Sequence, residues 1–310
     1  MSEVRVHIAP FVDDEMKAAV AEGGGRFVED PNEADAIVWT NPGDPEGLKT
    51  ILQTSPAKWI QLPFAGIESF FAAGAIDASR TWTCTKGIYG HATAEHALAL
   101  TLAGARRLPM HARAKSWGYS GGFGAEERRL KGATVLIVGT GGIGAALKDM
   151  LQPLGPQILA ANRSGKKLEG AERTVAIEHL DDVIGDADFV VIAAALTPET
   201  KGLIDARRLK LIKQGAWLIN VARGGLVVTE DLVEALRSQH LGGAALDVTD
   251  PEPLPDGHPL WDMPNALITP HVANTWDMAR PELIEMVKRN IGHYAAAEPL
   301  EGLVDPAAGY

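Results

Sequence analysis

Cysteine is almost absent from this sequence, whose one residue of this type is Cys84. A single cysteine excludes a disulfide within the chain and a zinc site built from several thiolates. The sequence also lacks a run of about 18 apolar residues, the length that could span a membrane, and it lacks the profile of a secretory signal. We therefore expect a cytoplasmic protein with no metal site and no membrane partner.

Positive charge is also scarce, with 29 Lys and Arg against 40 Asp and Glu and a formal net charge of -11. A surface of this sign repels the phosphate backbone of nucleic acids, so we expect no nucleic-acid partner. The chain has 310 residues, of which 46% are hydrophobic. It can bury a large core and exceeds the usual size of one domain, so two domains are expected.

Short apolar runs alternate with helical stretches along most of the chain. The strands that this pattern predicts are residues 4–9, 36–40 and 59–62, and then 134–139, 157–161, 189–193, 216–221, 244–248 and 266–269. Helices between such strands indicate βαβ units and parallel sheets. A long helix at 91–106 could cross between the two domains, and a last helix at about 280–297 could return to the first. The sequence thus predicts an α/β fold with two parallel sheets.

A glycine-rich segment follows the first strand of the second series and opens a helical stretch. It contains Gly139, Gly141, Gly142, Ile143 and Gly144 in the pattern GxGxxG. Between a strand and a helix, this pattern places a pyrophosphate on the unpaired N–H groups of the helix N-terminus. An ordinary glycine-rich turn is the alternative. The context on both sides favours a dinucleotide-binding loop.

The end of the next strand distinguishes the two nicotinamide cofactors, because an acidic residue there binds the ribose 2′-hydroxyl and repels a 2′-phosphate. This sequence has Asn162 at that point, followed by Arg163, Ser164, Lys166 and Lys167. The carboxylate is missing, while cations and a hydroxyl that suit a phosphate are present. NADPH is therefore expected in preference to NADH. NAD stays possible, because such charges also occur in ordinary solvated loops.

Three later segments each follow a strand of the second series and carry one residue of interest. Arg223, Glu252 and His271 lie in the segments NVARGG, DVTDPEPLP and TPHVA. Ligands of parallel sheets bind outside the carboxyl ends of the strands, so we expect these three residues near one crevice. Taken singly, they could be a surface cation, a loop acid and a buried histidine. Their joint occurrence favours a catalytic site.

The glycine-rich loop and these three segments resemble the D-isomer-specific 2-hydroxyacid dehydrogenase family over nearly the whole chain. The segments NRS, HPLWDMPNALITPHVAN and LVDPAAGY are most similar to the short glyoxylate/hydroxypyruvate reductases of that family. The resemblance implies two Rossmann-like domains, with a cofactor domain inserted into a split substrate domain. It implies a substrate-binding domain of residues 1–92 and 280–310, a dinucleotide-binding domain of residues 93–279, and a homodimer.

The chemistry of a keto-acid reduction explains why these residue types occur together. A hydride must reach the carbonyl carbon and a proton its oxygen, and histidine readily exchanges a proton near cellular pH. His271 is the expected acid, and a nearby Glu252 would favour its imidazolium form. Arg223 can bind the substrate carboxylate and polarise the carbonyl. We expect NADPH-dependent reduction of a small 2-keto acid such as glyoxylate or hydroxypyruvate to the D-2-hydroxy acid.

Further residues are assigned from the resemblance. Ala65 and Gly66 match the family's substrate loop, whose N–H groups hold the carboxylate, although an ordinary turn is the alternative. Asp247 matches an aspartate near the nicotinamide amide. The other residues assigned to the cofactor are Val221, Ala222 and Ala273, together with Arg223 and His271.

Several other residues are not assigned to the site. His96 is expected to be structural or to lie at an interface, and His258 to lie in a solvated loop. Trp117 and Trp276 could wall a pocket but are left unassigned, since large aromatics more often belong to a core or an interface.

Two alternatives remain open. One is another enzyme of the family, such as one acting on 3-phosphoglycerate. A phosphorylated substrate would need cations around Ala65 and Gly66, but the residues around them are apolar apart from an acidic residue. The other is a nucleotide-sensing protein that binds the cofactor without turnover. The presence of Arg223, Glu252 and His271 argues against a protein that has lost its catalytic activity.

Overall fold

The chain divides into two compact units. A computed structural model describes residues 3–116 and 127–307, so Trp117 lies outside the described residues. The first unit comprises Met1–Tyr89 and Thr275–Tyr310, and the second comprises Gly90–Asn274. The second unit is thus inserted, in sequence, into the first. The domain boundaries expected after residues 92 and 279 stay a prediction.

The first unit contains a five-stranded sheet in the order β2-β1-β3-β4-β5, with every pair of neighbours parallel. Its elements are β1 (Val4–Ala9), α1 (Asp14–Glu22), β2 (Gly25–Phe27), the 3-10 turn η1 (Pro31–Glu33), β3 (Ala36–Trp39), α2 (Pro45–Leu52), β4 (Trp59–Gln61), α3 (Glu68–Ala72), β5 (Thr81–Thr83) and α11 (Trp276–Ala296). This strand order belongs to doubly wound sheets, in which helices cover both faces.

The last helix, α11, returns to this first sheet. Its residues Leu283, Val287 and Ile291 are fully buried in one cluster with Val4 and Val6 of β1. The apolar side chains of α11 recur every three or four residues, which places them on one face of the helix. The expected return of the last helix to the first domain is confirmed.

The second unit contains a seven-stranded parallel sheet in the order β12-β11-β10-β9-β6-β7-β8. Its strands are β6 (Thr134–Val138), β7 (Gln157–Asn162), β8 (Arg173–Ala176), β9 (Phe189–Ile192), β10 (Trp217–Asn220), β11 (Gly243–Leu246) and β12 (Ala266–Ile268). Its helices are α4 (Gly90–Ala105), α5 (Leu108–Arg113), α6 (Gly142–Leu151), α7 (Asp181–Ile184), α8 (Ala206–Leu211), α9 (Thr229–Arg237) and α10 (Pro259–Asp262), with the 3-10 turns η2 (Gln152–Leu154), η3 (Ile177–His179) and η4 (Gly224–Leu226). The strand order reverses direction between β6 and β9, which is the point where such sheets bind ligands.

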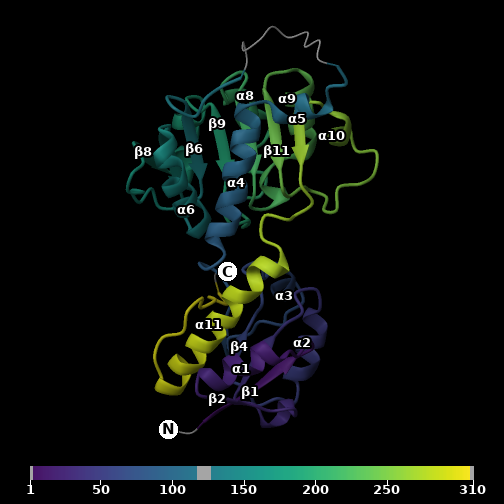
Figure 1. Ribbon diagram of the computed structural model, residues 1–310, viewed down its shortest axis with the longest axis vertical. Helices are drawn as coiled ribbons and strands as arrows, with labels where there is room; N and C mark the ends of the chain where they lie inside the picture. Colours follow the sequence, from purple (N-terminus) through teal and green to yellow (C-terminus); the bar gives the residue numbers. More distant parts are fainter. Residues whose placement is uncertain (1–2, 117–126, 308–310) are drawn as a thin grey trace. The chain divides into compact units, whose positions relative to one another are not determined.

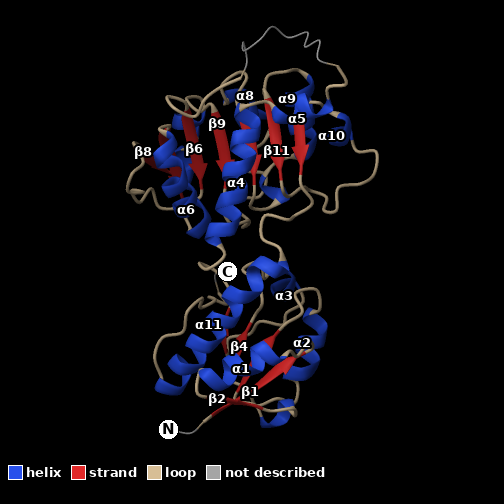
Figure 2. Cartoon of the chain, viewed as in Figure 1, coloured by secondary structure: helices blue, strands red, loops and turns tan. Residues whose placement is uncertain are grey.

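Both faces of this second sheet are buried, as Figure 2 shows by the helices packed around the strands. Successive side chains of a strand point to opposite faces. Val135 and Ile137 of β6 accordingly pack in the cluster of α4 and α6, whereas Leu136 and Val138 pack with α8 and α9 on the other face. Figure 1 shows α4 and α6 side by side across the first of these faces. The expected α/β fold with two parallel sheets is confirmed.

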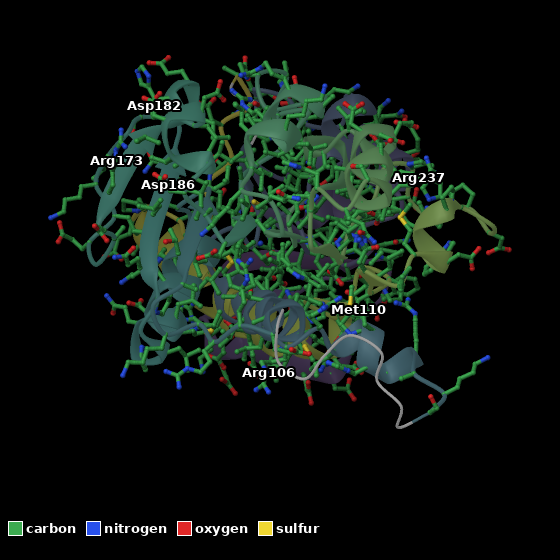
Figure 3. All side chains as sticks on the ribbon, turned by 90° about the horizontal axis from the view of Figure 1, so that it is seen from above. Arg106, Met110, Arg173, Asp182, Asp186 and Arg237 are labelled. Carbon is green, nitrogen blue, oxygen red and sulfur yellow. The ribbon has the colours of Figure 1, made fainter. Side chains whose placement is uncertain are left out.

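Some charged side chains of the second unit lie at its periphery. Figure 3 shows Arg173, Asp182 and Asp186 together on one side and Arg237 on the other. Among the described residues, no helix combines the length and the apolar character needed to cross a bilayer.

Candidate active site

The glycine-rich loop between β6 and α6 has the geometry of a phosphate cradle. Gly139 has a φ of +102°, and a Cβ there would lie 2.5 Å from the Ala193 carbonyl carbon after β9. A Cβ at Gly144 would overlap the carbonyl oxygen of Gly139, so α6 begins closely packed on the turn. By contrast, a Cβ at Gly141 would meet no described atom within 4 Å, which leaves space beside the N-terminus of α6.

This cradle fits a dinucleotide pyrophosphate. No side chain of the described residues caps the N-terminus of α6, so its first N–H groups can donate to an anion. The loop also lies where the strand order reverses between β6 and β9. Gly142 and Ile143, in the first turn of α6, belong to the same cradle.

Asn162, at the end of β7, shapes the loop beside this cradle. Its Nδ2 donates to Thr140 Oγ1 at 3.0 Å and to the Lys166 carbonyl at 2.7 Å, and its Oδ1 accepts from the Ser164 N–H at 3.2 Å. The side chain therefore joins the glycine-rich loop to the turn that presents Arg163 and Ser164, both of which are exposed. An amide suits this role because it donates and accepts at once.

The charge of Arg163 in this turn also acts on Glu199, in the loop after β9. A hydrogen bond from Thr197 lowers the pKa of the Glu199 carboxyl, with a smaller contribution from the charge of Arg163. The charge of Arg163, in the candidate 2′-phosphate site, thus acts on the loop after β9.

His271 and Glu252 form a direct pair. The Nδ1 of His271, after β12, lies 2.6 Å from Oε1 of Glu252, after β11. The two side chains are 51% and 41% exposed, so solvent or a substrate can reach them. A carboxylate on Nδ1 orients the imidazole and leaves Nε2 as its other proton-carrying nitrogen. This is the arrangement of a general acid held by a carboxylate.

The loop that carries His271 is attached to Asp247. The N–H of His271 donates to the Asp247 carbonyl at 2.8 Å, and the N–H groups of Val272 and Ala273 donate to its carboxylate at 2.9 and 3.0 Å. Burial raises the pKa of the Asp247 carboxyl, but the nearby His96 imidazole and the hydrogen bonds from Thr269 and these two N–H groups outweigh burial and hold it below its ordinary value. Asp247 is therefore a buried carboxylate whose charge is balanced by donors.

Arg223 follows β10 on a turn that Asn220 fixes. The buried Asn220 side chain donates to the Arg223 carbonyl at 2.9 Å and accepts from the Ala222 N–H at 3.1 Å. The next residue, Gly224, lies so close to Thr249 that a Cβ would overlap the Thr249 carbonyl. The Arg223 turn therefore packs on the backbone that leads to Glu252.

The three candidate catalytic residues follow three adjacent strands, β10, β11 and β12. The structure joins His271 directly to Glu252. The guanidinium of Arg223 donates to the Ala222 carbonyl at 2.7 Å within its own turn. Val221, Ala222 and Ala273 are buried at the same carboxyl ends of the strands.

The candidate substrate loop belongs to the first unit. Ala65 is exposed and Gly66 half-buried in the turn between β4 and α3. Phe64 lies 6.0 Å from the ring of Tyr89 and 5.7 Å from that of Trp276, so aromatic side chains support the turn. Trp276 therefore packs within this unit.

Two polar residues near the site were not assigned from the sequence. Asn220 and Thr269 lie inside the segments NVARGG and TPHVA, so an amide and a hydroxyl at the strand ends could have indicated them. His258, which was expected in a loop, lies half-buried in the loop before α10 and caps this helix, accepting from the Leu260 N–H at 3.3 Å.

Comparison with known proteins places this geometry in a family. The family model described as D-isomer specific 2-hydroxyacid dehydrogenase, NAD binding domain, matches residues 98–273, more than half of the chain. An uncharacterised protein of Corynebacterium melassecola is 40% identical over 306 residues, covering 96% of this chain and 97% of that protein. The mouse glyoxylate reductase/hydroxypyruvate reductase is 36% identical over 216 residues, covering 67% of this chain and 64% of the mouse protein.

Solved structures agree with these matches. A D-isomer specific 2-hydroxyacid dehydrogenase from Xanthobacter autotrophicus, in complex with NADPH and MES, superposes with a TM-score of 0.85 at 30% identity, covering 100% of both chains. An NADPH-dependent glyoxylate/hydroxypyruvate reductase from Sinorhizobium meliloti, in complex with NADP and sulfate, has a TM-score of 0.83 at 26% identity, covering 99% and 100%. The resemblance read from the sequence motifs is confirmed: this chain belongs to the D-isomer specific 2-hydroxyacid dehydrogenase family, whose members are NAD(P)-dependent oxidoreductases.

Proposed function

We propose that this protein is an NADPH-dependent reductase that converts a small 2-keto acid of the glyoxylate or hydroxypyruvate type into the D-2-hydroxy acid. The observation that carries the proposal is the pair of His271 and Glu252, 2.6 Å apart, at the carboxyl edge of a sheet with a phosphate cradle. In overall balance the keto acid takes up a hydride and a proton, and NADPH becomes NADP+.

The second unit would hold the cofactor. The residues proposed to bind it are Gly139, Gly141, Gly142, Ile143, Gly144, Asn162, Arg163, Ser164, Val221, Ala222, Arg223, Asp247, His271 and Ala273. When bound, the reduced nicotinamide supplies the hydride. The preference for NADPH is supported by Asn162, which replaces a carboxylate and fixes the turn of Arg163 and Ser164. Cations and hydroxyls on such a turn can bind a 2′-phosphate.

His271 would deliver the proton and Arg223 would position the substrate. Glu252 holds Nδ1 of His271, so Nε2 is the nitrogen from which the proton leaves for the carbonyl oxygen. The Arg223 guanidinium would bind the substrate carboxylate, which it can hold through two parallel N–H groups. In the oxidative direction the same His271 nitrogen would accept the proton.

The first unit would supply the substrate loop, with the N–H groups of Ala65 and Gly66 holding the carboxylate. Glu68, at the start of α3, is the charged residue closest in sequence to this turn, and it would repel a phosphorylated substrate. This favours glyoxylate or hydroxypyruvate over a phosphoglycerate-type substrate. The proposal includes a homodimer, as the resemblance to the family implies, and a cytoplasmic location.

The decisive experiment follows the absorbance of NADPH and NADH with glyoxylate, hydroxypyruvate and phosphorylated hydroxypyruvate. The proposal expects turnover with NADPH and an unphosphorylated keto acid, and loss of turnover by orders of magnitude in His271→Ala. Cofactor binding without turnover on any substrate would contradict it and favour a nucleotide-sensing protein. Preferred turnover of the phosphorylated substrate would contradict the substrate assignment.

A further inference from the structure

His96, on α4, makes a contact that links this helix to the loop of the candidate acid. Its Nε2 lies 3.0 Å from Thr269 Oγ1 and 3.4 Å from Asp247 Oδ1. The imidazole is 21% exposed and the Asp247 carboxylate 1% exposed. His96 therefore reaches a buried carboxylate at the ends of β11 and β12 from a helix that packs across the sheet.

The direction of these hydrogen bonds follows from the number of protons. The Thr269 hydroxyl lies 2.6 Å from Asp247 Oδ1, a distance at which it donates its one hydrogen to the carboxylate. The Thr269 oxygen then accepts from His96, so Nε2 of His96 carries a hydrogen. The result is a directed chain from His96 through Thr269 to Asp247.

The same Asp247 carboxylate holds the backbone that follows His271 in the chain. Its oxygens accept from the N–H groups of Val272 and Ala273. His271 itself has a φ of +53°, in the left-handed region that residues other than glycine seldom adopt. The hydrogen bonds before and after His271 therefore maintain a backbone conformation that the residue does not prefer.

We propose that His96 is a positioning residue for proton transfer: through Thr269 and Asp247 it keeps His271 in the backbone conformation that places Nδ1 on Glu252. The catalytic part of this inference rests on the proposed function, since it assumes that His271 delivers the proton. The structural part concerns only the loop 269–273. As a positioning residue, His96 does not touch the reacting atoms.

The variants His96→Ala and His96→Gln test the proposal, with Glu95→Ala as the matched control. Glu95 is the exposed neighbour of His96 on α4. In His96→Ala we expect kcat to fall roughly tenfold, the effect of one lost buried hydrogen bond, while KM for the keto acid changes little. In His96→Gln the amide can still donate to Thr269, so most of kcat should return. Glu95→Ala should match the wild type.

A second pair of variants, at Thr269, tests the same hydrogen-bond chain, so that the proposal does not depend on the His96 variants alone. Thr269→Val keeps the shape of the side chain but removes the hydroxyl, so it should reproduce the loss of kcat, whereas Thr269→Ser should not. In a His271→Ala background, His96→Ala should cause no further loss, because it acts through His271. A further loss of similar size in that background would overturn the proposal.

Amide hydrogen exchange provides a measurement that does not depend on activity. The Val272 and Ala273 amides should exchange faster in His96→Ala than in wild type and in Glu95→Ala. If the wild type reduces no keto acid, the proposed function fails, and exchange alone decides whether His96 holds the loop. Wild-type kcat in both His96→Ala and Thr269→Val, or equal losses in His96→Gln and His96→Ala, would overturn the inference.

Discussion

Replacing Glu252 by Gln changes one interaction of the candidate acid and leaves the shape of the side chain nearly intact. Glu252 Oε1 lies 2.6 Å from Nδ1 of His271. The glutamine oxygen can still accept the same hydrogen bond, but the negative charge that stabilises an imidazolium is lost. The variant therefore tests the charge of Glu252 separately from its position.

The size of the effect follows from distance and exposure. Two unit charges at this separation attract by about 2 kcal/mol in water and by about 6 kcal/mol at an effective dielectric constant of about 20. Both side chains are roughly half exposed, so screening reduces these values. The loss of the Glu252 charge should therefore cost more than the loss of an exposed ion pair and less than the loss of a buried hydrogen bond to a charge, at about 1.5 kcal/mol. We expect kcat/KM for the keto acid to fall roughly tenfold.

Initial rates with saturating NADPH and varied keto acid measure this change. Glu252→Ala also removes the orienting hydrogen bond, so it should lose more activity than Glu252→Gln. His271→Ala, which removes the proton donor, should lose the most. The affinity for NADPH should be unchanged in both Glu252 variants. Wild-type kcat/KM in Glu252→Gln would show that the charge of Glu252 makes no contribution, and an order of activity in which Glu252→Ala exceeds Glu252→Gln would refute the orienting role.

Three further predictions concern substrate, cofactor and stability. Arg223→Ala should raise KM for the keto acid and lower kcat, and unchanged kinetics would remove Arg223 from the site. Asn162→Asp should shift the ratio of kcat/KM from NADPH toward NADH, because a carboxylate would face the 2′-phosphate; an unchanged ratio would contradict this. Asp188→Asn should lower the free energy of unfolding by about 2 kcal/mol at neutral pH, because the carboxylate accepts from Arg128 and Lys213 at 2.7 Å each. Burial raises the pKa of Asp188, but these cations and the Thr134 N–H hold it below its ordinary value, so its contribution is complete above a pH of about 4 and is lost as the pH falls through the folded-state pKa. Urea unfolding should therefore show a difference between wild type and Asp188→Asn that shrinks in acid, and a constant difference would contradict the assignment.

The strands that the sequence predicted differ physically from those it did not. Central strands such as β6 and β9 are buried on both faces, so they appear in the sequence as continuous apolar runs. The strands without a prediction are β2, β5 and β8, and each is an edge strand of its sheet. Edge strands are short and partly exposed, so the segments GRF, TWT and RTVA lack the apolar pattern. Their pairing follows from the rest of the sheet rather than from local sequence.

The residues of the candidate site also differ in whether local sequence could predict them. The glycine-rich loop, Asn162 and the pair of Glu252 and His271 were assigned from short segments that each contain several informative residue types, and the structure brings the last two into contact. His96 lies 173 residues from Thr269 and on a helix whose local pattern indicates only packing. No local sequence rule predicts that contact. It arises because α4 crosses the face of the sheet near the ends of β11 and β12.

Close backbone contacts explain why the sequence segments at the carboxyl edge of the second sheet are so restricted. Gly139 brings the loop after β6 against Ala193 after β9, and Gly224 brings the turn after β10 against Thr249 after β11. At each place a Cβ would meet backbone atoms, which cannot move aside as a flexible side chain can. The separation between the phosphate cradle, Arg223 and Glu252 is therefore set by backbone-to-backbone contact. A larger residue at Gly139 or Gly224 would force these strand ends apart and move the candidate site residues relative to one another.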